Sequence, residues 1–129
     1  MANREKKYVI KIAPIAWKRP GLSGHRFFDG QQAEKVMFGL HLRNQHKDEP
    51  LFDKAIEIDI TFYMPTPASK KIKTGIQYHS TIADIDNLTK FVFDAMKSVL
   101  ITDDRIISIL HARKIYAKVP RTEFTIREL

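Results

Sequence analysis

The stretch Lys54-Ala55-Ile56-Glu57-Ile58-Asp59-Ile60-Thr61-Phe62-Tyr63-Met64 alternates apolar and polar side chains over nearly its whole length. Successive side chains of an extended chain point to opposite sides, so the pattern predicts a β-strand with one buried face and one solvated face. It is the clearest secondary-structure signal in the sequence, and the other elements are placed relative to it.

Before this strand, the sequence predicts a strand, a loop and a helix. The apolar run Tyr8 to Ile12 is ended by Pro14, which is typical of a short strand. Residues 17–26 combine Gly, Pro and cations and are predicted to form a loop. The helix is expected to be capped by Asp29 and to run to about Gln45, before the charged residues 47–50. Its apolar positions recur at helical spacing: Ala33, Val36, Met37 and Leu40.

After this strand, residues 65–75 contain two prolines and three lysines and are predicted to form a basic loop. A second helix is indicated by the helical spacing of Leu88, Phe91, Val92, Ala95 and Val99. Residues 106–117 and 123–127 are predicted to be two strands joined near Pro120. The expected fold is α+β, with a small mixed β-sheet and two main helices in the order β-α-β-α-β-β.

Length and composition restrict the class of protein. A chain of 129 residues with 43% hydrophobic side chains can bury one core, so residues 1–129 are expected to form a single domain. The net charge of +7 attracts polyanions. Because the chain has no cysteine, a bound metal would rest on carboxylates, water or histidine, which favours Mg²⁺ or Mn²⁺.

No apolar run approaches the roughly 18 residues of a membrane span, and no apolar segment follows the charged N-terminus as in a signal peptide. We therefore expect a cytoplasmic protein with no membrane partner. No motif for an organic cofactor is present, and no Gly-rich phosphate loop supports a nucleotide-transfer enzyme.

An acidic cluster interrupts this basic chain. Five of its fifteen acidic residues lie within residues 84–104: Asp84, Asp86, Asp94, Asp103 and Asp104. Carboxylates that bind metal, set in a chain that attracts polyanions, indicate a metal-dependent enzyme acting on nucleic acid, and a nuclease in particular.

The spacing of Asp84 and Asp86 constrains where the second helix begins. Side chains at i and i+2 share a side only in extended backbone, so both can bind one metal if the helix begins at or after Asp86. The alternative makes Thr81 the cap and turns the two carboxylates apart. Lys90, one turn after Asp86, either stabilises charge on a phosphate or joins a solvated row of ion pairs with Asp86 and Asp94.

Asp103 and Asp104 pose a problem of distance. About fourteen helical residues would place them roughly 20 Å from Asp86. A two-fold dimer with antiparallel copies of this helix would bring the acids together across the interface. The helix also has a second apolar face, which either packs on such a partner or is buried in its own protomer: Phe93, Met96 and Leu100.

Residues 84–104 resemble the RusA-type Holliday junction resolvases. The resemblance rests on the Asp-x-Asp-Asn-Leu-x-Lys motif at 84–90, on Phe93-Asp94-Ala95 and on the spaced pair Asp103-Asp104. Lys18-Arg19-Pro20 is similar to a basic element of phage-type members. Many members carry a basic residue before the first aspartate, where this chain has Ile82-Ala83, so a phosphate contact there is not carried over.

The resemblance implies a homodimeric endodeoxyribonuclease that binds four-way junction DNA and nicks two symmetric strands with Mg²⁺, in recombination and repair. It assigns Asp84, Asp86 and Asp104 to metal binding, with Asp103 as a neighbouring candidate, and Lys90 to catalysis. It also implies that the metal site is composite, formed across the dimer.

Basic residues outside the cluster are the candidates for contacts with the DNA backbone: Lys18, Arg19, Arg26, Lys70, Lys71, Lys73, Arg113 and Lys114. Such contacts make affinity fall with salt. Trp17, Phe27 and Phe28 are expected to pack in the protein, with stacking on an unpaired base as the alternative. His79 is expected to be structural, although it precedes the motif closely enough to approach the site. The main rival to a nuclease is a non-catalytic basic DNA-binding module, in which the acids only pair with neighbouring cations.

Overall fold

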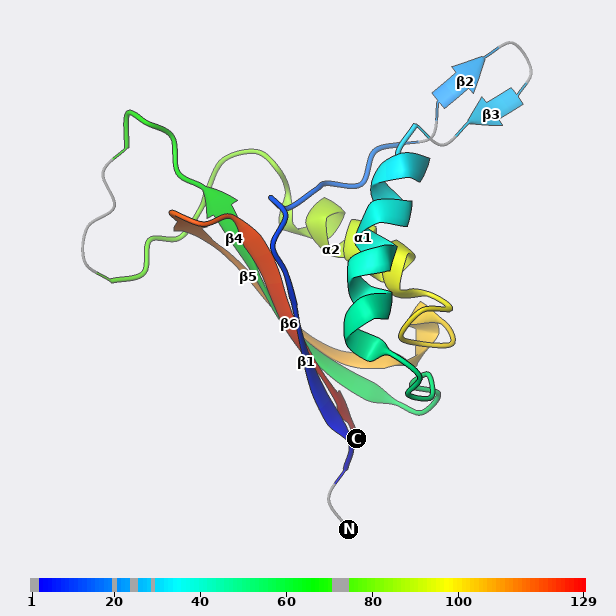
Figure 1. Ribbon diagram of the computed structural model, residues 1–129. Coiled ribbons are helices and arrows are strands. Elements are labelled where there is room, and N and C mark those ends of the chain that lie inside the picture. The colour runs from blue at the N-terminus through cyan, green and yellow to red at the C-terminus, as the bar shows by residue number, and fades with distance from the viewer. Residues whose placement is uncertain (1–2, 20, 24–25, 29, 71–74) are drawn as a thin grey trace.

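A four-stranded mixed β-sheet forms the frame of the protein, and two helices cover one of its faces (Figure 1). The computed structural model describes residues 3–19, 21–23, 26–28, 30–70 and 75–129, with the backbone alone for 21–23 and 26–28. The strands of the sheet are β1 (Glu5–Ile10), β4 (Ile56–Pro65), β5 (Ile107–Ala117) and β6 (Arg121–Glu128). The helices are α1 (Gln32–His46) and α2 (Ile85–Met96), and a short 3₁₀ helix, η1 (Asp104–Ile106), precedes β5.

The sheet has the strand order β1-β6-β4-β5, with β4 and β6 in the centre. β4 runs antiparallel to β6 and parallel to β5, and the crossover that a parallel pair requires contains α2. The alternation that predicted a strand over 54–64 is confirmed in β4. Ile58, Ile60 and Phe62 are fully buried, whereas Asp59 lies on the opposite, exposed face.

The predicted α+β class and the order β-α-β-α-β-β are confirmed for the main sheet and its helices. The first strand begins earlier than predicted, at Glu5, and ends at Ile10. Within the predicted loop at 17–26 the chain instead begins a small hairpin, whose strands β2 (Gly21–Ser23) and β3 (Arg26–Phe28) pair antiparallel. In such a hairpin the backbone groups pair with each other, whereas in a loop they bind water. A composition typical of loops therefore does not exclude a hairpin.

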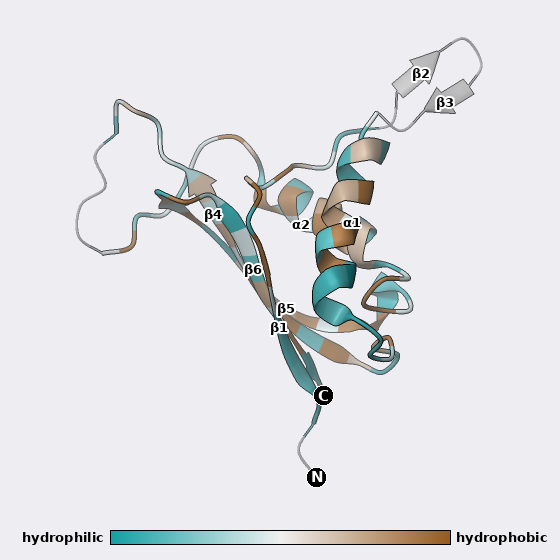
Figure 2. Cartoon of the chain, in the orientation of Figure 1, coloured by the Kyte–Doolittle hydropathy of each residue, from teal (hydrophilic) through white to brown (hydrophobic). Residues whose placement is uncertain are grey.

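Helix α1 is confirmed, but its apolar spacing did not identify its buried side. Val36, Met37 and Leu40 are each slightly more than 50% exposed. The side that packs against α2 and the sheet instead carries Phe38 and Leu42. Figure 2 shows apolar positions along α1 and a hydrophilic last turn. The expected cap, Asp29, lies outside the described residues, and Gln31 occupies the N-cap position without a side-chain capping bond.

Helix α2 is buried in its own protomer, which is the second of the two alternatives for its additional apolar face. Met96 and Leu100 are fully buried with the main face of Leu88 and Phe91, and Phe93 is partly buried. Phe38 of α1 meets the ring of Phe91 edge to face, with ring centroids 5.5 Å apart. Antiparallel packing of α2 on a second copy would therefore have only a small apolar surface available.

Neither α1 nor α2 has the length and hydrophobicity of a membrane-spanning helix, and no other helix among the described residues does. The start of β1 and the end of β6 lie close together at one end of the sheet (Figure 1), because the two strands are antiparallel neighbours.

Candidate active site

Asp86, Lys90 and Asp104 line one pocket of about 430 Å³ in a single protomer. The first turns of α2 form one wall, and the start of β5 forms the other with Leu110 and Ala112. Apart from the two carboxylates and the lysine, the lining is largely apolar. Asp86 and Lys90 are exposed and are therefore accessible to a charged ligand.

The estimate that roughly 20 Å separates Asp104 from Asp86 rested on a wrong premise. It assumed a helix up to Asp103, whereas α2 ends at Met96. Ser98 adopts a left-handed backbone conformation with φ 63°, and the amides of Val99 and Leu100 both donate to the Met96 carbonyl. The chain therefore reverses immediately after the helix and carries Asp104 back towards its first turns.

Reciprocal backbone bonds hold this reversed segment. The amide of Phe52 donates to the carbonyl of Leu100 at 2.8 Å, and the amide of Thr102 donates to the carbonyl of Phe52 at 3.0 Å. Phe52 is fully buried. The segment that leads to Asp104 is thus held by the core of its own protomer.

Asp84 occupies the N-cap position of α2, and Asp86 lies in its first turn. Neither expected helix start was correct, because the helix begins at Ile85, between the two aspartates. Asp84 has extended backbone angles and its side chain makes no capping bond. It is not part of the pocket lining, and within the described ranges no three Asp, Glu or His side chains converge as a metal-binding group.

Asp103 has a local structural role in this arrangement. Its carboxylate accepts from the backbone amide of Arg105 and pairs with the Arg105 guanidinium, each at 3.3 Å, and so caps η1. Asp104 is the member of the pair that faces the pocket.

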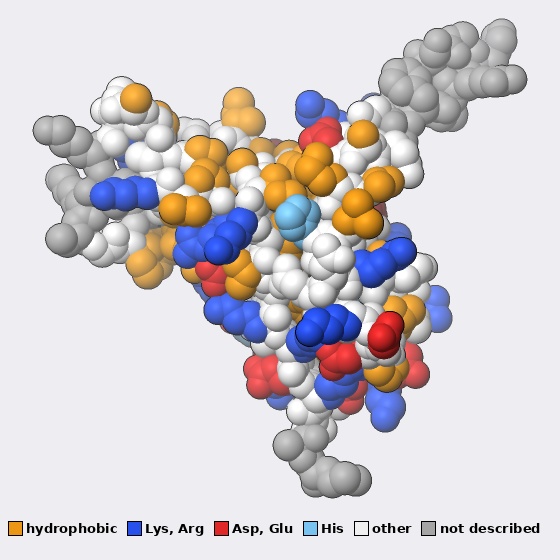
Figure 3. All heavy atoms as spheres, viewed as in Figure 1, with side chains coloured by type: hydrophobic (Ala, Val, Ile, Leu, Met, Phe, Trp, Pro, Cys, Tyr) orange, Lys and Arg blue, Asp and Glu red, His pale blue; other side chains and the backbone are white. Residues whose placement is uncertain are grey.

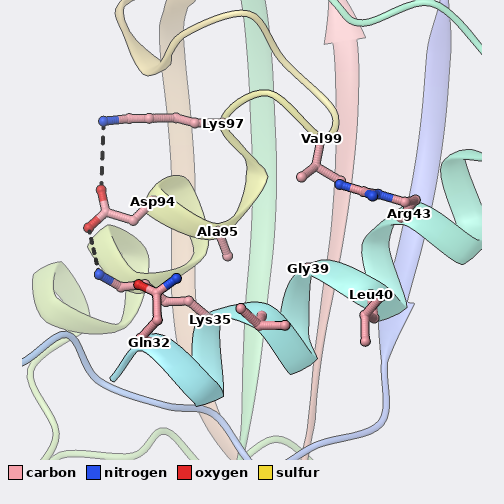
Figure 4. Close-up of a pocket in the computed structure, with 10 residues that line it drawn as sticks. Gln32, Lys35, Gly39, Leu40, Arg43, Asp94, Ala95, Lys97 and Val99 are labelled. Carbon is pink, nitrogen blue, oxygen red and sulfur yellow. Dashed lines mark ion pairs between the residues drawn. The ribbon is translucent and has the colours of Figure 1, made fainter. Parts of the chain in front are cut away.

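Lys97 is a charged neighbour of the site that sequence reasoning missed. Its Nζ lies 3.5 Å from Oδ2 of Asp104 and 3.8 Å from Oδ1 of Asp94. Asp94 lies between Lys97 and Lys35, as Figure 4 shows. The i, i+3 spacing of Asp94 and Lys97 could have indicated that pair, but the contact with Asp104 depends on the chain reversal.

The structure describes the side chains of five of the eight predicted DNA-contacting residues. Lys18 and Arg19 are exposed, in the segment that leads from Trp17. Exposed Lys70 places its Nζ 4.6 Å from the centroid of the Tyr116 ring. Lys71 and Lys73, and the side chain of Arg26, lie outside what the structure describes. Over the visible face basic side chains are dispersed, with acidic ones among them towards the end where the termini lie (Figure 3).

Arg113 and Lys114 are neighbours in β5 that point to opposite faces. On the face without helices, Arg113 donates to Asp59 at 2.7 Å and to Thr61 at 2.8 Å. The hydrogen bond between Arg113 and Asp59 lowers the pKa of Asp59 and raises that of Arg113. On the helix side, Lys114 donates to the carbonyls of Thr81 and Ala83 at 2.7 and 2.6 Å. Lys114 thus supports the segment that leads into Asp84.

His79 is part of the packing beside this segment. It is 8% exposed, its ring lies 4.8 Å from that of Tyr116, and its Nε2 is 3.2 Å from the Thr81 hydroxyl. Burial is the main cause that lowers the pKa of His79, and the nearby charges of Lys114 and Lys70 add to it. These contacts favour the structural interpretation of His79.

Comparison with known proteins extends the resemblance beyond the motif. The family described as endodeoxyribonuclease RusA matches residues 14–127. The chain is also 31% identical over 136 aligned positions to the uncharacterized protein YqaN of Bacillus subtilis (strain 168), a match that covers 95% of this chain and 96% of YqaN. The matched region includes both helices, β4, β5 and the whole of the pocket.

Proposed function

This chain belongs to the RusA endodeoxyribonuclease family, and we propose that it is a Mg²⁺-dependent enzyme that resolves Holliday junctions by paired, symmetric nicks. Among the observations, the one that carries the proposal is the pocket shared by Asp86, Lys90 and Asp104. It combines hard oxygen donors with a cation, the groups that metal-assisted hydrolysis of a phosphodiester uses.

The donor set of the pocket suits Mg²⁺, with Mn²⁺ as a substitute. Mg²⁺ keeps several waters and is usually bound by one or two carboxylates together with phosphate oxygens. Asp86 and Asp104 supply two carboxylates, and Asp84, at the N-cap of α2, is the further candidate. When bound, the metal would supply an activated water and would neutralise charge on the phosphate.

Lys90 is proposed to act on the scissile phosphate. Its side chain is exposed, on the second turn of α2, and it lines the pocket with the two acids. An ammonium at this position stabilises the negative charge that develops on the phosphate oxygens or on the leaving oxygen during hydrolysis. Its removal should therefore reduce the rate of cleavage more than the affinity for DNA.

Two symmetric nicks require two sites related by two-fold symmetry, so we propose a homodimer. Because one protomer already brings Asp86 and Asp104 to one pocket, distance no longer requires a composite metal site. The exposed apolar side of α1 is a surface that a second copy could cover. For an enzyme with this substrate we propose the cytoplasm of a bacterial or phage-infected cell as its location.

The test is cleavage of a labelled four-way junction and of a linear duplex with the same sequence, in Mg²⁺ and in EDTA. Asp86→Asn is compared with Asp48→Asn, which alters an exposed aspartate beyond the end of α1. We expect paired, Mg²⁺-dependent nicks in the junction alone from the wild type and Asp48→Asn. Asp86→Asn should bind the junction at least as tightly without cutting it, because metal charge is lost and basic contacts remain.

A non-catalytic junction-binding module is the alternative. In this alternative the acids only balance neighbouring cations. The ion pair of Lys97 with Asp104 is an observation that favours it. Tight binding without cleavage in Mg²⁺ or Mn²⁺ would favour it and would reject the nuclease proposal. Equal loss of binding and cleavage in folded Asp86→Asn would reject the metal-binding role of Asp86.

A further inference from the structure

Trp17 lies against the lysine of the proposed site. The Nζ atom of Lys90 is 4.9 Å from the centroid of the Trp17 ring. A lysine ammonium within about 6 Å of an indole face is attracted by the ring electrons. Without such a contact the long, flexible side chain of an exposed lysine samples many conformations.

The chain on both sides of Trp17 is anchored by one buried side chain. Gln31, at the N-cap of α1, is 3% exposed. Its Oε1 accepts from the amide of Lys18 at 2.8 Å, and its Nε2 donates to the carbonyl of Ala16 at 2.7 Å. A glutamine that binds both neighbours of Trp17 fixes the direction in which the indole projects.

A third bond connects Trp17 itself to the site-bearing helix. Its amide donates to the carbonyl of Asn87, in the first turn of α2, at 2.9 Å. The indole is partly buried and packs against the hydrophobic core. The segment 16–18 is therefore held by both helices, and the ring has a fixed surface to offer to Lys90.

We propose that Trp17 is a positioning residue that holds the Lys90 ammonium at the edge of the pocket, available to a phosphate. Asp104 forms its ion pair with Lys97, whereas Lys90 is held by its contact with the Trp17 ring. A phosphate can outcompete this ring contact for the ammonium of Lys90. A firm salt bridge to a pocket carboxylate would instead neutralise both groups. This inference rests on the proposed catalytic role of Lys90.

A double-mutant cycle on junction cleavage tests it. Trp17→Leu should lower kcat about 3- to 10-fold with little change in KM, and Trp17→Phe should restore part of the loss, since phenylalanine keeps a ring face. In the Lys90→Met background, Trp17→Leu should cause no further loss, because its effect acts through the lysine. An equal additional loss in that background would reduce Trp17 to a packing residue and overturn the proposal.

Fluorescence tests the contact without catalysis. Trp17 is the one tryptophan of the chain, so the tryptophan emission reports on its surroundings. Lys90→Met should shift or intensify this emission, whereas Lys97→Met, which removes the lysine paired with Asp104, should leave it unchanged. If the wild type cuts no junction, the proposed function is rejected. The emission then still tests whether Trp17 and Lys90 are in contact. Unchanged emission in folded Lys90→Met would overturn the inference in either case.

Discussion

Lys97 and Asp104 form an ion pair with Nζ and Oδ2 3.5 Å apart, at the point where the chain has reversed from the end of α2 to the start of β5. The ammonium therefore occupies a position beside one of the two carboxylates proposed to hold Mg²⁺. In the absence of metal it balances the charge of Asp104. A metal ion bound at the proposed site would therefore compete with Lys97 for the Asp104 carboxylate.

Removal of this competitor should strengthen metal binding. Lys97→Met is expected to lower the Kd for Mg²⁺ by up to about 5-fold, because partly exposed ion pairs are worth up to about 1 kcal/mol. Isothermal calorimetry with Mg²⁺ in the absence of DNA measures the change. Lys118→Met is the matched control, because Lys118 is an exposed lysine beyond the opposite end of β5. Weaker Mg²⁺ binding by Lys97→Met would show that Lys97 organises Asp104 and does not compete for it.

Lys114 and Lys18 should differ in how their loss affects DNA cleavage. Lys114 donates to two carbonyls ahead of Asp84, so Lys114→Met should lower kcat while the slope of log affinity against log salt stays unchanged. Lys18 is exposed, and Lys18→Met should weaken junction binding and reduce that slope by about 1. Junction binding over a range of salt concentrations, with kcat measured alongside, separates the two. A reduced salt slope for Lys114→Met would assign its charge to the DNA.

Neighbouring residues of α1 should differ in their effect on stability. Phe38 is 2% exposed and packs on Phe91, so Phe38→Ala should lower the free energy of unfolding by about 3–5 kcal/mol. Met37 is 52% exposed, and Met37→Ala should change it by less than about 0.5 kcal/mol in a monomer. Denaturant unfolding at several protein concentrations measures both. If Met37→Ala lowers stability in a concentration-dependent manner and shifts sedimentation towards the monomer, the exposed face of α1 is the dimer interface.

Stability should fall as the pH drops below about 6.5. Burial lowers the pKa of His46 from its ordinary value of 6.5, although the hydrogen bond to Pro50 opposes this shift, and Nδ1 lies 2.7 Å from the Tyr8 hydroxyl. The unfolded chain therefore binds a proton at a pH where the folded protein does not. The resulting stabilisation is fully present above pH 6.5 and is lost as the pH falls towards the folded pKa.

Substitution of this histidine checks the effect. His46→Gln should flatten the dependence of unfolding free energy on pH between about 7 and 5.5, with the lowered pKa of His79 contributing what remains. His41→Gln removes an exposed histidine from the same helix and serves as the control. Carboxylates whose pKa is lowered, such as Glu57, titrate below this pH range and do not contribute to the slope within it. An unchanged slope in His46→Gln would assign the effect to another group.

Local patterns in the sequence were enough to predict several features of the protein. The alternation over 54–64 identified β4, and helical spacing identified α2. Strand and helix periodicities depend on residues close in sequence, so they can be read without the fold. The motif at 84–90 and the pair Asp103-Asp104 likewise indicated the family. Such a motif consists of residue types at a fixed spacing, which can be read from the sequence without the fold.

Tertiary structure alone decided which groups meet. Apolar residues lie on more than one side of α1, and only the packing of α2 and the sheet selects Phe38 over Val36 and Leu40 for burial. The approach of Asp104 to Asp86 depends on a reversal at Ser98 that is fixed by backbone bonds to Phe52, about fifty residues earlier. Lys97 meets Asp104 through that reversal, whereas the segment of Trp17 is held beside Lys90 by bonds to Gln31 and Asn87. Such contacts are set by the free energy of the whole core, which no local pattern contains.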